Sequence, residues 1–305
     1  LGLQADPALR AREARVLDRA TLPEHNKNRD ISFINLIVPA KMVVKEVIRG
    51  FVSKKNVYLV DSWETAISSA LDRCYEAGSE GFSFPSTLLI PDQGGRGIFL
   101  AQKDNFNVVK VKTHLGALLL THLRTIANEK SMLLMSSLGG FFVKQSMREI
   151  DEICKIKNTL LINDVSGSIF SYDAGYGDVV IGSFKPSGFN YGGFIACDEK
   201  LNINENFDMA KIPDLIDWIE DLNARLVKVK DKCRKVKEDL KDFEVVHRES
   251  DSLVVVVRYR SDEEKSNILK YCEDNKFEYL ECPRYSRVKE KAISIEVKNE
   301  LKRTN

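Results

Sequence analysis

The stretch from Leu160 to Phe194, LLINDVSGSIFSYDAGYGDVVIGSFKPSGFNYGGF, decides how the rest of the chain is interpreted. An apolar run at residues 159–162 predicts a buried strand that carries Asp164 just beyond its end. A second apolar run at residues 179–181 predicts another strand, which is followed closely by Lys185. Open α/β sheets bind ligands at the carboxyl ends of their strands, so Asp164 and Lys185 are expected at a binding site.

Predicted strands and helices alternate along the chain before this stretch. The predicted strands cover residues 56–61, 86–90, 107–111 and 132–135. Helical spacing of apolar residues predicts helices at 34–49 (ended by Gly50), 66–74, 115–126 and 147–153, with a shorter helical stretch at 98–101. This alternation predicts an α/β fold with a mainly parallel sheet and helices on both faces.

The pattern changes after Pro213. An apolar seam with spacings of four and three predicts a long helix, and it is formed by Leu222, Leu226, Val229, Cys233, Val236 and Leu240. The other faces of this helix are rich in lysine and are expected to face solvent. Strands near 243–247, 253–259, 277–280 and 292–297, with a helix at 264–272, predict a small α+β domain with an antiparallel sheet.

Composition limits the classes of function. The chain has 305 residues, 43% of them hydrophobic, and a net charge of +1, which offers no field to steer nucleic acid or an anionic membrane. No apolar run is long enough to span a membrane. Charged residues between positions 10 and 18 would interrupt the apolar core of a secretory signal, so we expect none in these residues. The six cysteines lack metal-ligand spacing, so we expect reduced thiols in a cytoplasmic protein and no metal site.

The residues around positions 130–195 resemble the centre of the fold-type I pyridoxal-phosphate (PLP) enzymes, the aspartate aminotransferase superfamily, with DegT-like features. The resemblance implies a seven-stranded large domain in which Asp164 pairs with the pyridine nitrogen and Lys185 forms the internal aldimine. It also implies that Ser166 contacts the cofactor and that Ser183 helps to hold its phosphate. The PLP ring accepts the electron pair released at the substrate α-carbon, and a lysine can move protons there.

Residues 62–65 follow a predicted strand and open a predicted helix. Backbone N–H groups and the helix dipole make such a turn an anion site, and the resemblance implies that it binds the PLP phosphate. Ser62, Trp63, Glu64 and Thr65 are therefore candidate cofactor-binding residues, although glycine is common in the family where Trp63 and Glu64 stand. An ordinary helix cap made by Ser62 explains the same residues.

Four further site residues are implied by the resemblance. Gln93 lies where the family often places an aromatic side chain over the cofactor ring, and Ser137 lies near the cofactor's phenolic oxygen. Arg284 and Arg287 are candidate ligands for the α-carboxylate of the substrate, because a guanidinium group binds a carboxylate in bidentate fashion.

These observations predict a homodimeric PLP-dependent enzyme that acts on an amino acid or a related amine, with its active site near the dimer interface. Aminotransferase is the leading activity, and a lyase, decarboxylase or desulfurase would use the same two residues. The short interval from Asp164 to Lys185 leaves open a catalytically inactive relative that serves as a binding or regulatory subunit. Further alternatives are an unrelated domain that binds another phosphate ligand and a substrate linked to tRNA. The expected organisation is an N-terminal helical arm or linker at 1–30, a large domain at 31–210 and a small domain at 211–305.

Overall fold

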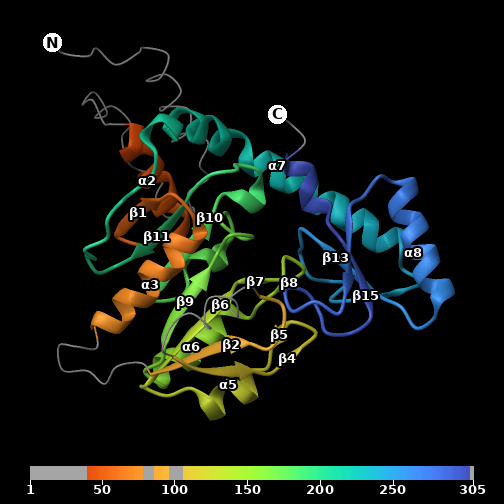
Figure 1. Ribbon diagram of the computed structural model, residues 1–305, viewed down its shortest axis with the longest axis horizontal. Coiled ribbons are helices and arrows are strands. Elements are labelled where there is room, and N and C mark those ends of the chain that lie inside the picture. The colour runs from red at the N-terminus through yellow and green to blue at the C-terminus, as the bar shows by residue number, and fades with distance from the viewer. Residues whose placement is uncertain (1–39, 78–85, 96–105, 303–305) are drawn as a thin grey trace.

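A seven-stranded sheet forms the centre of the protein in the computed structural model, which describes residues 40–77, 86–95 and 106–302 (Figure 1). The strand order is β1-β11-β10-β9-β6-β2-β3. These strands are β1 (Asn56–Val60), β2 (Thr87–Pro91), β3 (Asn107–Val111), β6 (Ser131–Ser136), β9 (Leu160–Asp164), β10 (Val179–Ser183) and β11 (Gly193–Cys197). The predicted mixed α/β class with a mainly parallel sheet is confirmed.

One strand of this sheet runs against the others. Strands β3, β2, β6, β9 and β10 pair in parallel, whereas β11 is antiparallel to both of its neighbours, β10 and β1. Close backbone approach explains the glycines at this reversal, since a Cβ on Gly193 would lie 2.5 Å from the carbonyl oxygen of Gly182. Because β9 and β10 are parallel neighbours, their carboxyl ends lie at the same edge of the sheet.

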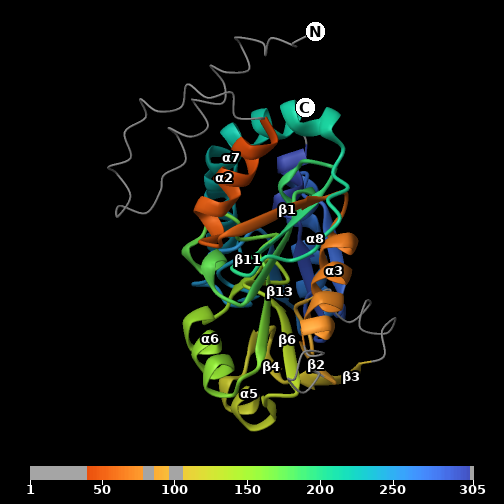
Figure 2. The same ribbon diagram turned by 90° about the vertical axis from the view of Figure 1, so that its left-hand side faces the viewer.

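Helices cover both faces of the sheet, as Figure 2 shows. Helix α3 (Trp63–Ala77) packs on one face, and α2 (Ala40–Val52), α5 (Leu120–Ile126) and α6 (Met147–Ile156) pack on the other. Apolar side chains alternate between the faces, so that in β2 Leu88 and Ile90 contact the α3 side while Leu89 contacts the α5 and α6 side. A strand that is buried on both faces reads as a continuous apolar run, which is why the sequence revealed these strands.

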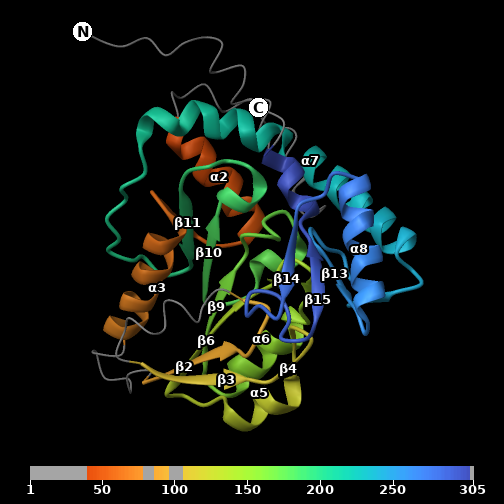
Figure 3. The same ribbon diagram turned by 45° about the vertical axis from the view of Figure 1, so that its right-hand side comes forward.

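The second sheet is antiparallel and lies beside the first, with the order β12-β13-β15-β14. Its elements are β12 (Glu244–Val245), β13 (Val255–Arg258), α8 (Asp262–Asp274), β14 (Tyr279–Cys282) and β15 (Ala292–Ile295). The long helix α7 (Ile212–Asp239) reaches from the first sheet to the second, and Figure 3 shows it crossing from α2 to α8. The apolar seam predicted for this helix is buried.

One apolar core continues through α7 into both sheets. It joins side chains of α2, β1 and β11 to side chains of α7, β13, α8 and β15. The division into a large domain at 31–210 and a small domain at 211–305 therefore stays a prediction. The predicted arm at 1–30 and the helical stretch at 98–101 lie outside the described residues.

Two predicted helix boundaries are wrong. Helix α2 does not stop at Gly50 but continues to Val52, which is fully buried in the core. The predicted helix at 115–126 begins only at Leu120, because a hairpin of β4 (Thr113–His114) and β5 (Ala117–Leu118) precedes it. Buried Gln145 fixes this hairpin: its Oε1 accepts from the Leu118 N–H at 3.0 Å, and its Nε2 donates to the Gly116 carbonyl at 2.8 Å. Because Gln145 is 27 residues from Leu118 in the sequence, the local pattern of apolar residues could not predict this contact.

Within the described ranges, no helix is both long enough and apolar enough to cross a membrane.

Glu205 is predicted to stabilise the junction of α2 and β1 in a pH-dependent way. Its carboxylate accepts hydrogen bonds from Lys41, Lys45 and the Leu59 N–H, each at 2.8 Å. Burial alone would raise the pKa of Glu205, but these three donors lower it below its ordinary value. The stabilisation is thus present above the unfolded pKa of roughly 4.3 and is lost as the pH falls through the lower folded value.

Glu205→Gln should therefore reduce the free energy of unfolding at pH 7 by about 1–2 kcal/mol, and by much less at pH 3. Urea unfolding at the two pH values measures this difference, with the exposed Glu199→Gln as the control. Equal stability of Glu205→Gln and the unmodified protein at pH 7 would contradict the prediction.

Candidate active site

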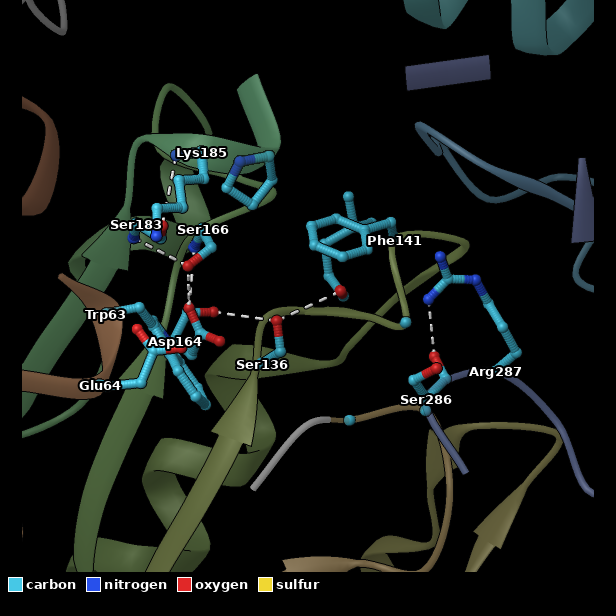
Figure 4. Close-up of a pocket in the computed structure, with 15 residues that line it drawn as sticks. Trp63, Glu64, Ser136, Phe141, Asp164, Ser166, Ser183, Lys185, Ser286 and Arg287 are labelled. Atoms are coloured by element: carbon cyan, nitrogen blue, oxygen red, sulfur yellow. Dashed lines mark hydrogen bonds between the residues drawn. The ribbon is translucent and has the colours of Figure 1, made fainter. Parts of the chain in front are cut away.

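A cavity opens at the carboxyl ends of β9 and β10 and is closed on its other side by the segment before β15 (Figure 4). The structure brings seven of the twelve predicted site residues to its walls: Trp63, Glu64, Asp164, Ser166, Ser183, Lys185 and Arg287. Ser62, Thr65, Gln93, Ser137 and Arg284 are not among the residues that line it. The seven come from α3, from β9 and β10 with the residues just beyond their ends, and from the C-terminal segment, so the fold assembles the cavity from distant parts of the chain.

Asp164 and Lys185 follow from the register of two neighbouring strands. Asp164 is the last residue of β9 and pairs with Ile181 of β10, so Lys185 lies four residues beyond that pairing. Lys185 opens a short 3-10 helix, η5 (Lys185–Ser187), and its side chain is exposed. The interval between the two residues is short because strand β10 is preceded only by a turn and the 3-10 helix η4 (Tyr172–Gly175).

A chain of hydrogen bonds runs from the carboxylate to the backbone of the lysine. Oδ1 of Asp164 accepts from the N–H of Ser166 at 2.9 Å and from its Oγ at 2.5 Å. The Ser166 Oγ in turn accepts from the N–H of Ser183 at 2.9 Å, and the Ser183 Oγ accepts from the N–H of Lys185 at 3.3 Å. Both serines are buried. The Ser166 hydroxyl therefore ties the orientation of the Asp164 carboxylate to the end of β10.

The first turn of α3 faces the cavity through Trp63 and Glu64. Ser62 caps the helix, since its Oγ accepts from the N–H of Thr65 at 3.1 Å. The hydroxyl groups of Ser62 and Thr65 also donate to Oδ1 of Asp61, at 3.0 Å and 2.6 Å respectively. These hydroxyls are thus occupied within the turn, and what α3 offers the cavity is its positive N-terminal end, opposed by the carboxylate of Glu64.

The other three predicted residues have partners outside the cavity. Gln93 is buried, and its Oε1 accepts from the N–H of Lys289 at 2.7 Å. Ser137 is buried, and its Oγ lies 2.5 Å from that of Ser168. Arg284 is exposed, and its Nε donates to the Glu281 carbonyl at 3.3 Å.

Loop 91–95 after β2 binds the C-terminal segment. The Gly94 N–H donates to the Tyr285 carbonyl at 2.8 Å, and the Tyr285 hydroxyl donates to the Pro91 carbonyl. The Nζ of Lys289 also pairs with Asp92 at 3.1 Å. These contacts bring Ser286 to the cavity wall next to Gly94. The role of Gln93 in this structure is therefore to hold the C-terminal segment.

Eight residues that line the cavity were not among the predicted site residues: Gly94, Gly95, Ser136, Leu138, Gly140, Phe141, Pro186 and Ser286. Ser136 ends β6 and pairs with Asp164 across the parallel ladder, and its Oγ donates to the Asp164 carbonyl at 3.0 Å. The strand ends predicted from the sequence were a sufficient signal to include it. Phe141 and Ser286 carried no such signal, because they reach the cavity through tertiary packing alone.

Arg287 lines the cavity and is buried, and it forms a bidentate ion pair. Its Nη2 donates to both carboxylate oxygens of Glu296, at 2.9 and 2.8 Å. Burial alone would raise the pKa of Glu296, but the charges of Arg287 and Lys298 lower it below its ordinary value. Glu296 therefore remains a carboxylate at neutral pH and keeps Arg287 paired.

Comparisons with solved structures identify the fold. Serine palmitoyltransferase from S. paucimobilis, solved with a bound PLP–myriocin aldimine, is 14% identical with a TM-score of 0.64, covering 97% of this chain and 82% of that one. DndA from Streptomyces lividans is 12% identical with a TM-score of 0.66, covering 97% and 98%. Ureidoglycine–glyoxylate aminotransferase from Bacillus subtilis is 15% identical with a TM-score of 0.58, covering 96% and 85%. The chain has the fold of the fold-type I PLP enzymes, as its sequence predicted.

Sequence comparisons are more restricted. Residues 223–303 match the MJ1341 family C-terminal domain, which covers the end of α7 and the second sheet. No curated protein matches the chain.

Ser166→Ala is predicted to destabilise the protein, because it leaves the buried N–H of Ser183 without the hydroxyl that accepts from it. An unsatisfied buried donor costs about 1–3 kcal/mol of the free energy of unfolding. Ser137→Ala is the matched control, since no backbone N–H donates to its hydroxyl among the described hydrogen bonds. Urea unfolding compares the two variants. If Ser166→Ala loses no more free energy of unfolding than Ser137→Ala, the hydrogen bond from the Ser183 N–H to the Ser166 hydroxyl does not stabilise the protein.

Proposed function

We propose that the chain is a PLP-dependent enzyme that acts on an amino acid or a related amine, with aminotransferase as the leading activity. The observation that carries the proposal is that Asp164 and Lys185 line one cavity at the ends of two parallel strands. Similar structures support it, since serine palmitoyltransferase, which shares the fold, was solved with a PLP adduct.

The groups around the cavity fit the chemistry of PLP. A carboxylate on Asp164 suits a protonated pyridine nitrogen, and the amine of Lys185 suits the aldehyde carbon. The N-terminal end of α3 and the hydroxyl of Ser183 suit a phosphate. Glu64 is the one group among these that disfavours an anion, because its carboxylate lies in the same first turn of α3. Four complementary groups against one opposing charge favour the cofactor.

In this proposal the protein's own residues position the cofactor and move protons. Asp164 keeps a proton on the pyridine nitrogen, and Ser166 holds the Asp164 carboxylate in the orientation that this requires. Lys185 would hold the aldehyde carbon of the cofactor through Nζ, and the same amine would carry a proton to or from the substrate α-carbon. When bound, PLP supplies an electron sink for bonds that break at that carbon.

The same residues would serve transamination, elimination or decarboxylation, because the fold does not determine the reaction. A PLP-dependent lyase or decarboxylase is therefore the closest alternative. Glu64 favours a second alternative, a relative that has lost catalysis and acts as a binding or regulatory subunit, because its charge opposes phosphate at the end of α3.

We also propose a cytoplasmic homodimer with the cavity near the interface between its subunits. The exposed side chain of Lys185 supports this placement, since a second subunit could cover it. Cys154, Cys197, Cys233, Cys272 and Cys282 are free and buried, which suits a reducing compartment. Burial raises the pKa of Cys154 to about 12 and that of Cys197 to about 11, so these thiols stay protonated and unreactive.

The lysine is tested by covalent trapping. Purified protein mixed with PLP should show a visible absorption band, and borohydride should fix PLP to the tryptic peptide that contains Lys185, as read by mass spectrometry. Lys185→Ala should lack the band, while Lys200→Ala, an exposed lysine beyond β11, should keep it. If unmodified protein shows no band, the enzyme proposal fails. If Lys185→Ala keeps a reducible band, a different lysine holds the cofactor.

Glu64→Gln distinguishes the enzyme from the inactive relative. Removing the charge should tighten PLP binding by about three- to tenfold, because one unfavourable interaction near the phosphate is lost. Equilibrium titration of PLP measures the change, at low and high salt, with the exposed Glu199→Gln as the control. Binding of PLP by the unmodified protein with a dissociation constant in the micromolar range supports the enzyme. Binding that appears only in Glu64→Gln supports the inactive relative.

A further inference from the structure

The guanidinium group of Arg287 already binds a carboxylate along the edge formed by Nε and Nη2. Nε donates to Ser294 Oγ at 2.9 Å and to Glu296 Oε1 at 3.1 Å, and Nη2 donates to both oxygens of Glu296. Nη1 donates to the Ser286 carbonyl at 2.8 Å. A bidentate carboxylate complex uses two adjacent nitrogens of one edge, and Glu296 occupies the edge formed by Nε and Nη2.

Glu296 is not a partner that a substrate would readily displace. The side chains of Arg287 and Glu296 are only 6% and 4% exposed. Glu296 also accepts hydrogen bonds from Ser294 Oγ at 2.8 Å and from Lys298 Nζ. A substrate carboxylate that took Arg287 would leave the Glu296 carboxylate buried without its main counter-charge, which is strongly unfavourable.

Phe141 lies between this ion pair and the loop after Asp164. The guanidinium carbon of Arg287 is 5.7 Å from the centre of its ring, and Nζ of Lys298 is 5.6 Å from the same centre. The ring also packs against Gly167, where an added Cβ would lie 2.7 Å from it. Figure 4 shows Phe141 between Arg287 and the group formed by Asp164, Ser166 and Lys185.

The backbone of Phe141 is held by hydrogen bonds from the segment just before β13. Its carbonyl oxygen accepts from the N–H groups of Leu253 at 2.8 Å and Val254 at 3.1 Å. Its φ of 67° is in the left-handed region, which a residue with a bulky side chain adopts only when its surroundings impose it. The neighbouring Gly140 has no room for a side chain, since an added Cβ would lie 2.8 Å from the Ser286 carbonyl.

We propose that Arg287 is a positioning residue: paired with Glu296, it holds Phe141 as a wall of the cavity and does not bind the carboxylate of a substrate. Phe141 then supplies an aromatic surface on the cavity side. This inference rests on the proposed function for its meaning in catalysis, but the placement of Phe141 can be tested without the cofactor.

The test places 4-fluorophenylalanine at position 141 in the full 305-residue chain and records its ¹⁹F spectrum. Arg287→Met and Glu296→Gln should each move the resonance toward that of the free amino acid, because both remove the ion pair that holds the ring. Arg284→Met is the matched control, since this arginine is exposed and does not line the cavity, and it should leave the resonance unchanged. An unchanged resonance in Arg287→Met would overturn the proposal.

Affinity for PLP gives the second measurement. Phe141→Leu, Arg287→Met and Glu296→Gln should each weaken PLP binding by about tenfold, and the losses of the last two should not add in the double variant. If Arg287 instead bound the carboxylate of the substrate, Arg287→Met would keep the affinity for PLP. It would weaken the binding of L-alanine or L-phenylalanine and leave the binding of ethylamine or phenethylamine, which lack the carboxylate, unchanged. That pattern would also overturn the proposal.

Two outcomes separate this inference from the proposed function. If the unmodified protein does not bind PLP, the proposed function fails, while the fluorine spectra still decide the role of Arg287. If Arg287→Met does not fold, the double variant Arg287→Met/Glu296→Met removes both buried charges and is expected to fold. Its fluorine resonance should then shift as in Glu296→Gln, and an unshifted resonance would again contradict the proposal.

Discussion

The hydrogen bond between Ser166 and Asp164 is the contact on which the site depends. The Ser166 hydroxyl donates to the Asp164 carboxylate and accepts from the Ser183 N–H, so it links the ends of β9 and β10. Through this hydroxyl, the orientation of the carboxylate at the end of β9 is coupled to the segment that carries Lys185 beyond the end of β10. A catalytic group must be held to a fraction of an ångström, and two buried serines provide hydrogen bonds that hold this one.

The second sheet completes the cavity. The segment before β15 is fastened to loop 91–95 by Gly94 and Gln93, and the ion pair of Arg287 with Glu296 backs the ring of Phe141. The two sheets share an apolar core through α7, so this wall and the strand ends belong to one packed unit. The chemistry of the site is thus supplied by the first sheet, and much of its shape by the second.

Sequence patterns predicted the strands well and the polar contacts poorly, for a physical reason. Buried parallel strands are continuous apolar runs whose carboxyl ends share an edge, so the sequence pattern alone predicted that Asp164 and Lys185 meet at one site. The alternative explanation for Ser62, a helix cap, matches its hydrogen bond to Thr65. The contacts of Gln93 with Lys289 join residues almost two hundred positions apart, and no local pattern reports them.

A crystal structure of the protein grown with PLP tests the central claim most directly. The account predicts continuous density from Lys185 Nζ to the cofactor, a pyridine nitrogen within hydrogen-bond distance of Asp164, and a phosphate at the start of α3. The ring should lie in the cavity that Phe141 borders. Density for PLP on another lysine, or a pyridine nitrogen turned away from Asp164, would contradict the account.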